Sequence, residues 1–280
     1  MTPAPLLTDP TALRRNRARA TAMPTPALFL HEAAIAEVQE RLETVNRTFT
    51  KPAVVVGFPS LWADAFPGTR LVEDSDLLEF DPSGHDLIVH ALSLHWANDP
   101  VGQIVQCRRA LRPDGLFMGF LFGGQTLQEL RACLAMAEVE ETGGLSPRIV
   151  PMGEIRDLGA LLQRAGLALP VADSFTLQVL YRDAWHLMAD LRAMGEANAL
   201  AGRLRRPTRR SVFRRAAELY VQHHSDAQGR IPATFEIICL TGWAAHESQQ
   251  KPLRPGSAQQ RLSDALNSAE IPLPASDRNR

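Results

Sequence analysis

Polar side chains that could bind a ligand or move a proton follow two apolar stretches of the sequence. The stretch "HDLIVHALSLHW" has an aspartate as its second residue, continues as an apolar run and ends in Ser93, His95 and Trp96. The shorter stretch "TRLVED" ends in Glu73 and Asp74. In a parallel sheet, ligands bind at the edge where the strands reach their carboxyl ends. We therefore expect one cleft there, with His95 in catalytic or substrate contact; a histidine packed beside the Trp96 indole is the alternative.

A third stretch, "KPAVVVGFPSLW", decides whether a nucleotide-like cofactor can bind at that edge. It contains an apolar run suited to a buried strand, followed by Gly57, Phe58 and Pro59. A cofactor turn needs glycines so that backbone N–H groups can approach the ligand, and a proline removes one such donor. An acidic residue after the second strand must also hold the ribose. Glu73 or Asp74 could serve, or both could belong to a solvated acidic loop.

Two further polar stretches lie in the C-terminal half. "MGEAN" contains Glu196 and Asn198 near the predicted end of a helix, where they either line the same cleft or cap the helix. "AHESQQKP" contains His246 and Glu247, and its dense polarity favours a surface for a substrate peptide or a partner.

The sequence offers no pattern for a metal centre. An iron-type hydroxylase would use two histidines and a carboxylate, and no such spacing occurs near the strands described above. His223 and His224 are adjacent, so on a helix they point in different directions. We predict no metal site. The three cysteines form no CxxC pair and are expected to be buried, reduced thiols.

The elements that would position these residues follow a strand–helix–strand order. Apolar runs predict strands over residues 53–57, 69–74, 85–94, 116–123 and 231–243. Helical spacing predicts helices over residues 27–49, 101–111, 125–144, 183–200 and 209–224, and a helix, a glycine turn and a strand over 155–174. This rhythm is typical of a parallel sheet covered by helices.

The composition is that of a core-forming α/β protein. The chain has 280 residues, 45% of them hydrophobic, and a net charge of −1, which gives no reason to expect nucleic acid as a partner. No apolar run reaches the roughly 20 residues of a membrane span. We divide the chain into an irregular basic arm (1–26), a domain (27–260) with a helical region at about 183–228, and a disordered tail (261–280). The arm's "LRRNRARA" has the composition of a mitochondrial transit peptide, but we prefer a basic surface arm and expect a cytoplasmic protein.

Taken together, these stretches resemble a known family. "HDLIVHALSLHW", followed by "ALRPDG" and "LFMGFLFG", is similar to the fourth and fifth strands of the S-adenosylmethionine-dependent methyltransferases. "FGGQTLQELR", "RDLGALLQRAG", "DLRAMGEAN", "IPATFEI" and "GWAAHESQQKPLRPGSA" resemble the branch of that superfamily that contains a respiratory complex I assembly factor described as an arginine hydroxylase. The resemblance covers roughly residues 80–260 and extends more distantly to biotin-pathway methyltransferases.

The resemblance implies an α/β fold with a Rossmann-like methyltransferase sheet, a helical C-terminal extension and an insertion. The front of the sequence departs from the family, which has a turn of the type D-x-G-x-G-x-G where this chain has one glycine. About 15 residues separate Gly57 from the acidic segment, too few for a full crossover and a further unit. We therefore expect the sheet to be shortened at its second strand.

The resemblance also implies a function and its residues. S-adenosylmethionine would bind at Gly57, Glu73, Asp74, Ser93 and His95, with His95 as the catalytic residue. A protein substrate or partner, such as a complex I subunit, would contact Trp96, Glu196, Asn198, His246 and Glu247. Two hypotheses follow. The chain is a protein-modifying enzyme of methyltransferase or hydroxylase type, or it is a non-catalytic pseudo-methyltransferase that lost its cofactor and acts as a binding or assembly factor.

Overall fold

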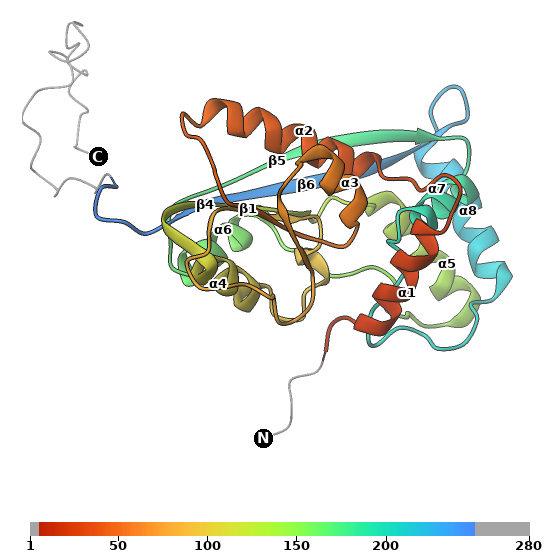
Figure 1. Ribbon diagram of the computed structural model, residues 1–280. Helices are drawn as coiled ribbons and strands as arrows, with labels where there is room; N and C mark the ends of the chain where they lie inside the picture. The colour runs from red at the N-terminus through yellow and green to blue at the C-terminus, as the bar shows by residue number, and fades with distance from the viewer. Residues whose placement is uncertain (1–5, 250–280) are drawn as a thin grey trace, which may run out of the picture. The chain divides into compact units, whose positions relative to one another are not determined.

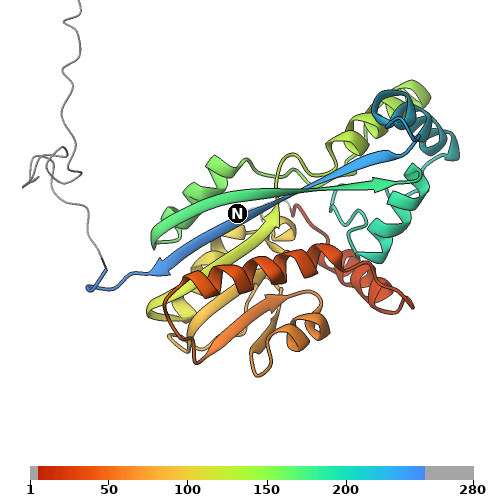
Figure 2. The same ribbon diagram turned by 90° about the horizontal axis from the view of Figure 1, so that it is seen from above.

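The computed structural model describes residues 6–249 and contains a mixed sheet of six strands. The strands are β1 (Pro52–Val56), β2 (Arg70–Glu73), β3 (His85–Ala91), β4 (Leu111–Phe122), β5 (Leu167–Tyr181) and β6 (Ile231–Ala244). Their order across the sheet is β2-β1-β3-β4-β6-β5. The first four run parallel, and β6 runs antiparallel between β4 and β5 (Figures 1 and 2). The predicted α/β class with a Rossmann-like sheet is confirmed.

Both faces of the sheet are buried, which explains the continuous apolar runs of its central strands. All 7 residues of β3 are buried. Because successive side chains of a strand point to opposite faces, Val54 and Val56 of β1 enter one hydrophobic core, and Ala53 and Val55 enter the other. The helices that cover these cores are α2 (Phe29–Thr44) on the first, and α4 (Pro100–Ala110) and α6 (Ile155–Arg164) on the second.

The sheet is short on the side that ends at β2, as the sequence predicts. β2 pairs directly with β1, from Ala53 opposite Arg70 to Val56 opposite Glu73. Within residues 6–249, no strand lies beyond β2. One short helix that the sequence did not predict, α3 (Pro59–Ala65), connects the two strands. Proline suits the first position of a helix, where its missing N–H would have no partner, so "FP" begins this helix instead of a cofactor turn.

The predicted helical region lies at the far end of the long β5–β6 pair (Figure 2). Its members are α7 (Ala184–Ala193) and α8 (Arg210–His224), and α5 (Gln128–Thr142), which was predicted as a separate helix, packs against α8. Their buried faces complete the first core together with α2. These helices form one wall of the cavity described below.

The N-terminal arm is a correction to the sequence-based expectation. Residues 1–26 were expected to be irregular, but Pro10–Thr21 form helix α1. The Asp9 side chain caps this helix by accepting from the Ala12 N–H, and Pro10 begins it. The helix buries one face, with Ala12, Leu13, Asn16, Arg17 and Ala20. The helix is rich in arginine, and its few apolar residues form only a narrow face. The helical spacing of these apolar residues is therefore hard to recognise in the sequence.

The remaining expectations have mixed outcomes. The predicted tail over residues 261–280, and the predicted domain end at 260, lie outside the described residues. Among the helices of the described residues, none has the length and apolarity needed to cross a bilayer. The three cysteines are buried and unpaired, and burial raises the pKa of the Cys133 thiol to about 11.

Candidate functional site

Several predicted site residues come together at the carboxyl ends of the first three strands. Gly57 follows β1, Glu73 and Asp74 end and follow β2, and Ser93 and His95 follow β3. One cleft of about 500 Å³ is lined by Glu73, Asp74 and Ser93, among others, and a second of about 690 Å³ by Gly57, Glu73 and Asp74. The structure thus gathers these residues at one edge, while their roles stay predictions.

Arg17 of α1 covers this edge. Its Nη1 donates to both carboxylate oxygens of Asp74, at 2.7 and 2.5 Å, and the two side chains are only 9% and 7% exposed. The same guanidinium lies against Gly57, because a Cβ added to Gly57 would be 2.5 Å from Arg17 Cζ. Of the two acids that were predicted to hold a ribose, Asp74 is therefore already paired with a residue of this chain, and Glu73 is exposed.

The residues next to Gly57 also fill space at this edge. Phe58 is 3% exposed and packs edge-on against the His31 ring, with the ring centroids 5.1 Å apart. His31 in turn accepts from the Trp62 indole N–H at 3.3 Å. A nucleoside cofactor needs open backbone at the turn after β1 and a free acid after β2. At this edge Arg17 covers the backbone at Gly57 and pairs with Asp74, although Glu73 is exposed and lines both clefts. The covered turn after β1 therefore does not fit such a cofactor.

A second polar group lies deeper, where Glu196 meets the segment after β3. Glu196 Oε2 accepts from the Trp96 indole N–H at 2.7 Å and from His95 Nε2 at 3.3 Å. Burial disfavours the charged carboxylate, but hydrogen bonds from His95 and Trp96 and the nearby Arg17 outweigh it and lower the pKa of Glu196. Glu196 is therefore an ionised carboxylate held by two ring donors.

Local backbone geometry fixes Glu196 in this position. Helix α7 ends in a Schellman motif, in which Gly195 has a φ of 77° and its N–H donates to Arg192, while the Glu196 N–H donates to Leu191. A left-handed backbone conformation at this position favours glycine. The "MGEAN" stretch is thus a helix end, and it aims the Glu196 side chain inward.

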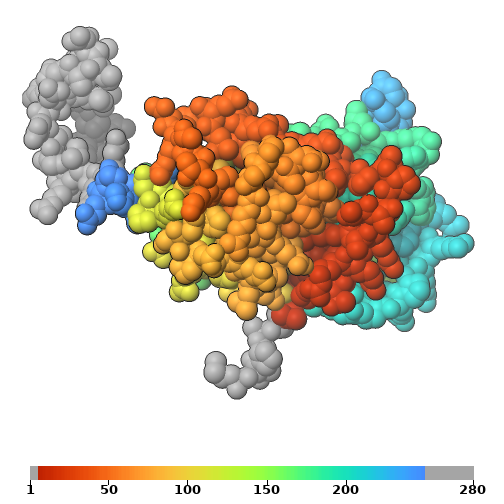
Figure 3. Space-filling model, viewed as in Figure 1, coloured from red at the N-terminus to blue at the C-terminus, as the bar shows by residue number. Residues whose placement is uncertain are grey.

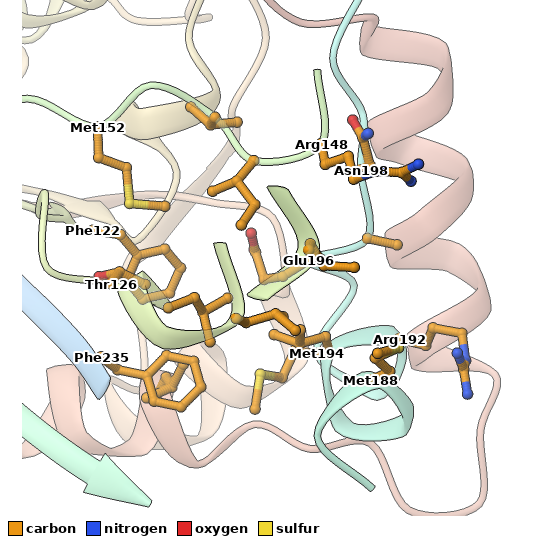
Figure 4. A pocket seen from close by; sticks show the side chains of 18 of the residues that line it. Phe122, Thr126, Arg148, Met152, Met188, Arg192, Met194, Glu196, Asn198 and Phe235 are labelled. Atoms are coloured by element: carbon orange, nitrogen blue, oxygen red, sulfur yellow. The ribbon is translucent and has the colours of Figure 1, made fainter. Parts of the chain in front are cut away.

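Glu196 faces a largely apolar cavity of about 370 Å³ (Figure 4). Figure 4 shows Glu196 among Phe122, Met152, Met194 and Phe235, with the Arg192 side chain directed away from the cavity. The lining also includes Leu30, Trp96, Thr126, Leu127, Leu130, Leu134, Arg148, Ile149, Val150, Trp185, Met188, Leu191, Ala197, Asn198 and Phe213. Arg148 is ion-paired with Glu138 at 2.6 Å, and Arg192 is directed away, so Glu196 is the charged group that faces the interior of the cavity.

His95 does not line the cavity itself, but it contacts Glu196 and Phe122, which do. The imidazole packs on the Phe122 ring, with centroids 4.5 Å apart, and its Nδ1 is buried with no hydrogen-bond partner among the described residues. His95 thus packs against the Trp96 and Phe122 rings, as the alternative reading of the sequence expected, and its catalytic or substrate contact stays a prediction.

The other predicted site residues have more limited roles in the structure. Ser93 is buried and hydrogen-bonded to His90 at 3.3 Å. Asn198 lines the cavity, but its amide donates to Pro147 O and its oxygen accepts from the Leu200 N–H, so it also ties loops together. His246 and Glu247 follow β6, and their part in binding a substrate or partner stays a prediction. In residues 6–249, no group of three or more histidine, cysteine or acidic side chains is placed to hold a metal ion.

Sequence reasoning did not single out Arg17, nor the aromatic and methionine lining of the cavity. Arg17 lies 57 residues from Asp74 along the chain, and its signal was weak: Ala12, Leu13, Asn16 and Ala20 flank it at the spacing of one helix face. The methionines and aromatics of the cavity come from separate helices and strands, so only the assembled fold brings them together.

The chain is similar to proteins of known name. It is 38% identical to the rat protein "Arginine-hydroxylase NDUFAF5, mitochondrial" over 222 residues, which cover 79% of this chain and 64% of that protein. The zebrafish (Danio rerio) protein of the same name is 36% identical over 222 residues, covering 79% of this chain and 69% of that one. A malonyl-(acyl-carrier protein) O-methyltransferase of Laribacter hongkongensis is 32% identical over 183 residues, covering 65% and 59%. No protein-family model matches the chain.

These relatives are longer than the matched region. The chain spans 64, 63 and 62% of the length of the rat, mouse and human proteins. Solved structures with a similar arrangement include the Bacillus subtilis YcgJ protein (TM-score 0.48, 12% identity, 74% of this chain and 97% of that one). Another is a Haemonchus contortus phosphoethanolamine N-methyltransferase with S-adenosylmethionine (TM-score 0.40, 11% identity, 75% and 53%).

The names of the relatives correct one prediction from the sequence. A cytoplasmic protein was expected, but the rat and human relatives are named as mitochondrial proteins, which overturns that expectation. The arginine-rich "LRRNRARA" stretch, which resembles a transit peptide in composition, is in the structure part of helix α1 and contributes Arg17 to the edge where Asp74 lies.

Proposed function

Because the chain belongs to the family of the arginine-hydroxylase NDUFAF5 proteins, we propose that it binds an arginine side chain of a protein partner in the cavity that Glu196 faces. The observation that carries this proposal is a buried, ionised carboxylate at the inner wall of an apolar cavity. A complex I subunit is the partner that the sequence resemblance suggests.

An arginine side chain matches both parts of this cavity. Its three methylene groups suit an apolar lining, and its guanidinium group is a planar donor that pairs well with a carboxylate. The volume of about 370 Å³ lies at the lower end of small-molecule sites. Methionines such as Met188 and Met194 have flexible side chains that can adjust to an entering group.

The same carboxylate separates the two reactions named among the relatives. A malonyl group carries a negative charge at its free end, and Glu196 would repel that charge in a poorly solvated site. A guanidinium group gains an ion pair there instead. The cavity therefore favours the arginine-directed members of the family over those that act on malonyl groups.

We assign His95 a positioning role in this site. It does not line the cavity, but it donates to Glu196, as Trp96 does. Two ring donors on one oxygen fix the direction of the carboxylate and leave Oε1 for the guanidinium group. This assignment applies whether the partner's arginine is modified or only bound, so it is shared by the enzyme hypothesis and the binding-factor hypothesis.

Calorimetric titration with capped Gly-Arg-Gly peptide and its citrulline counterpart tests the proposal. Citrulline has nearly the same shape as arginine but no charge. We expect the arginine peptide to bind at least tenfold more tightly, because a hydrogen bond to a charged group contributes about 1.5–3 kcal/mol. E196Q should remove this preference, whereas E218Q, on the exposed face of α8, should keep it. Equal affinity for the two peptides in the unmodified protein would overturn the proposal.

A further inference from the structure

The contacts of Arg17 have a meaning of their own, independent of the arginine-binding cavity. A nucleoside cofactor at the carboxyl ends of the first strands, which we call the front edge, needs two things from the protein. These are open backbone after β1 and an acid after β2. Arg17 occupies the first and one of the two candidate acids, because its guanidinium lies on Gly57 and pairs with Asp74, while Glu73 at the end of β2 stays exposed. Each of these contacts comes from the same side chain.

Arg17 is also held from the opposite side. A Cβ added to Gly195 would lie 3.1 Å from Arg17 Cγ, 3.2 Å from Arg17 Cα and 2.9 Å from Phe58 Cζ. Gly195 therefore contacts the stem of Arg17, and Gly57 contacts its guanidinium group. The two glycines hold the two ends of the same side chain.

Several polar contacts along helix α1 and just before it hold the helix in place. Asp9 pairs with Arg203 at 3.0 Å and with Arg205 at 3.1 Å. The Asn16 amide donates to Ala197 O at 2.8 Å, and Thr8 forms a β-bridge with Leu200. Figure 1 shows α1 beside α7, and Figure 3 shows the red surface of α1 next to the orange surface of the front of the sheet.

The two clefts at this edge show what Arg17 does to the available space. The cleft of about 500 Å³ and the cleft of about 690 Å³ share Arg14, Arg17, Glu73 and Asp74 in their linings. The shared residues include both members of the ion pair. The Arg17–Asp74 pair therefore stands between two halves of what would be one larger site.

We infer that Arg17 is a built-in plug, which replaces a nucleoside cofactor at the front edge with contacts from this chain's own N-terminal helix. The chain then keeps the fold of its family but does not bind S-adenosylmethionine or S-adenosylhomocysteine. The replacement is chemical as well as steric, since a guanidinium group satisfies the buried Asp74 carboxylate that would otherwise need a ligand or water. The plug does not depend on what the Glu196 cavity binds.

Calorimetric titration of the full chain with S-adenosylhomocysteine tests the plug. The unmodified protein and R15A, an exposed arginine on the same helix, should show no saturable binding up to millimolar ligand. R17A should gain affinity at least tenfold relative to them. R17A/D74N is the second variant: it leaves no unpaired buried charge, and the amide oxygen that it introduces after β2 can still accept from a ribose hydroxyl. Circular dichroism establishes that each variant is folded.

The outcomes divide cleanly. Silence in the unmodified protein together with a gain in either folded variant supports the plug. Micromolar binding by the unmodified protein overturns it, and so does the absence of a gain in both folded variants. Hydrogen–deuterium exchange of the unmodified protein gives a check that needs no variant: 5 mM S-adenosylhomocysteine should leave the exchange of α1 and of residues 57–74 unchanged, and protection of these segments would contradict the plug. The peptide titrations with E196Q report on a different cavity, so the two proposals can fail separately.

Discussion

Arg17 and Asp74 are each tolerated in a buried position only because the other is present. Removing one partner of a buried ion pair leaves an uncompensated charge, which costs about 3–5 kcal/mol. We therefore expect R17A and D74N each to lower the free energy of unfolding by several kcal/mol. D74N should cost less, because the asparagine amide oxygen can still accept a hydrogen bond from the Arg17 guanidinium group. The double variant should lose less than the sum of the two, because the variants share one interaction. Urea unfolding measures all three, and simple additivity would show that the pair contributes no coupling.

Two buried histidines make the stability of the fold dependent on pH. Burial is the main cause that lowers the pKa of His31 and of His90 from 6.5 to about 4. Between these values the unfolded chain binds protons that the folded chain does not, so the free energy of unfolding falls as the pH is lowered from about 6.5 to about 4. A full shift corresponds to about 3 kcal/mol for each histidine.

Urea unfolding at pH 7, 6 and 5 measures this dependence. H90Q should retain a hydrogen-bonding side chain opposite Gln103 and should show a shallower fall in stability. H223Q, on the exposed end of α8, is the matched control and should leave the slope unchanged. A slope in H90Q as steep as in the unmodified protein would assign the acid sensitivity to other groups.

Helix α1 depends on its N-cap residue, Asp9. Asp9 caps the helix by accepting from the Ala12 N–H at 3.1 Å, and the hydrogen bonds from Ala12 and the two arginines lower the pKa of Asp9 to about 2. We expect D9A to loosen the whole helix, since it removes the cap and both ion pairs to Arg203 and Arg205. Hydrogen–deuterium exchange should become faster across Pro10–Thr21. D157A, in the first turn of α6, is the control; faster exchange of α1 in both variants would show a general loss of stability.

The helices and strands could be predicted from the sequence wherever burial on one or both faces leaves a clear pattern. The apolar runs of β1, β3 and β4 and the 3.6-residue spacing of α2 and α8 are such patterns. β5 was predicted to end near residue 174 but continues to Tyr181, because an edge strand alternates between partly buried and exposed residues and carries a weak apolar signal. α1 and α3 were missed for opposite reasons: arginines obscured the first, and Phe58-Pro59 suggested a failed cofactor turn in place of the second.

The candidate site was predictable only where it depends on one edge of the sheet. Parallel strands necessarily bring Gly57, Asp74 and His95 to the same edge, so strand assignments were enough to group them. Arg17 reaches that region from a distant segment, by packing that no local pattern encodes. Glu196 was named from the sequence, but whether it lines a cleft or caps its helix could not be decided without the fold. The sequence therefore indicated where ligands of the fold family bind, but it could not show that the chain itself occupies part of that place.

Gly195 is in contact with both the Arg17 site and the segment that carries Glu196. Its backbone lies against Arg17, and the next residue carries the carboxylate that faces the cavity. The Schellman turn around it leaves little freedom to move one neighbour without the other. Any coupling between the Arg17 contacts and the cavity is reciprocal: by whatever factor displacement of Arg17 alters affinity for a guanidinium group at Glu196, occupation of Glu196 alters the ease of displacing Arg17 by the same factor.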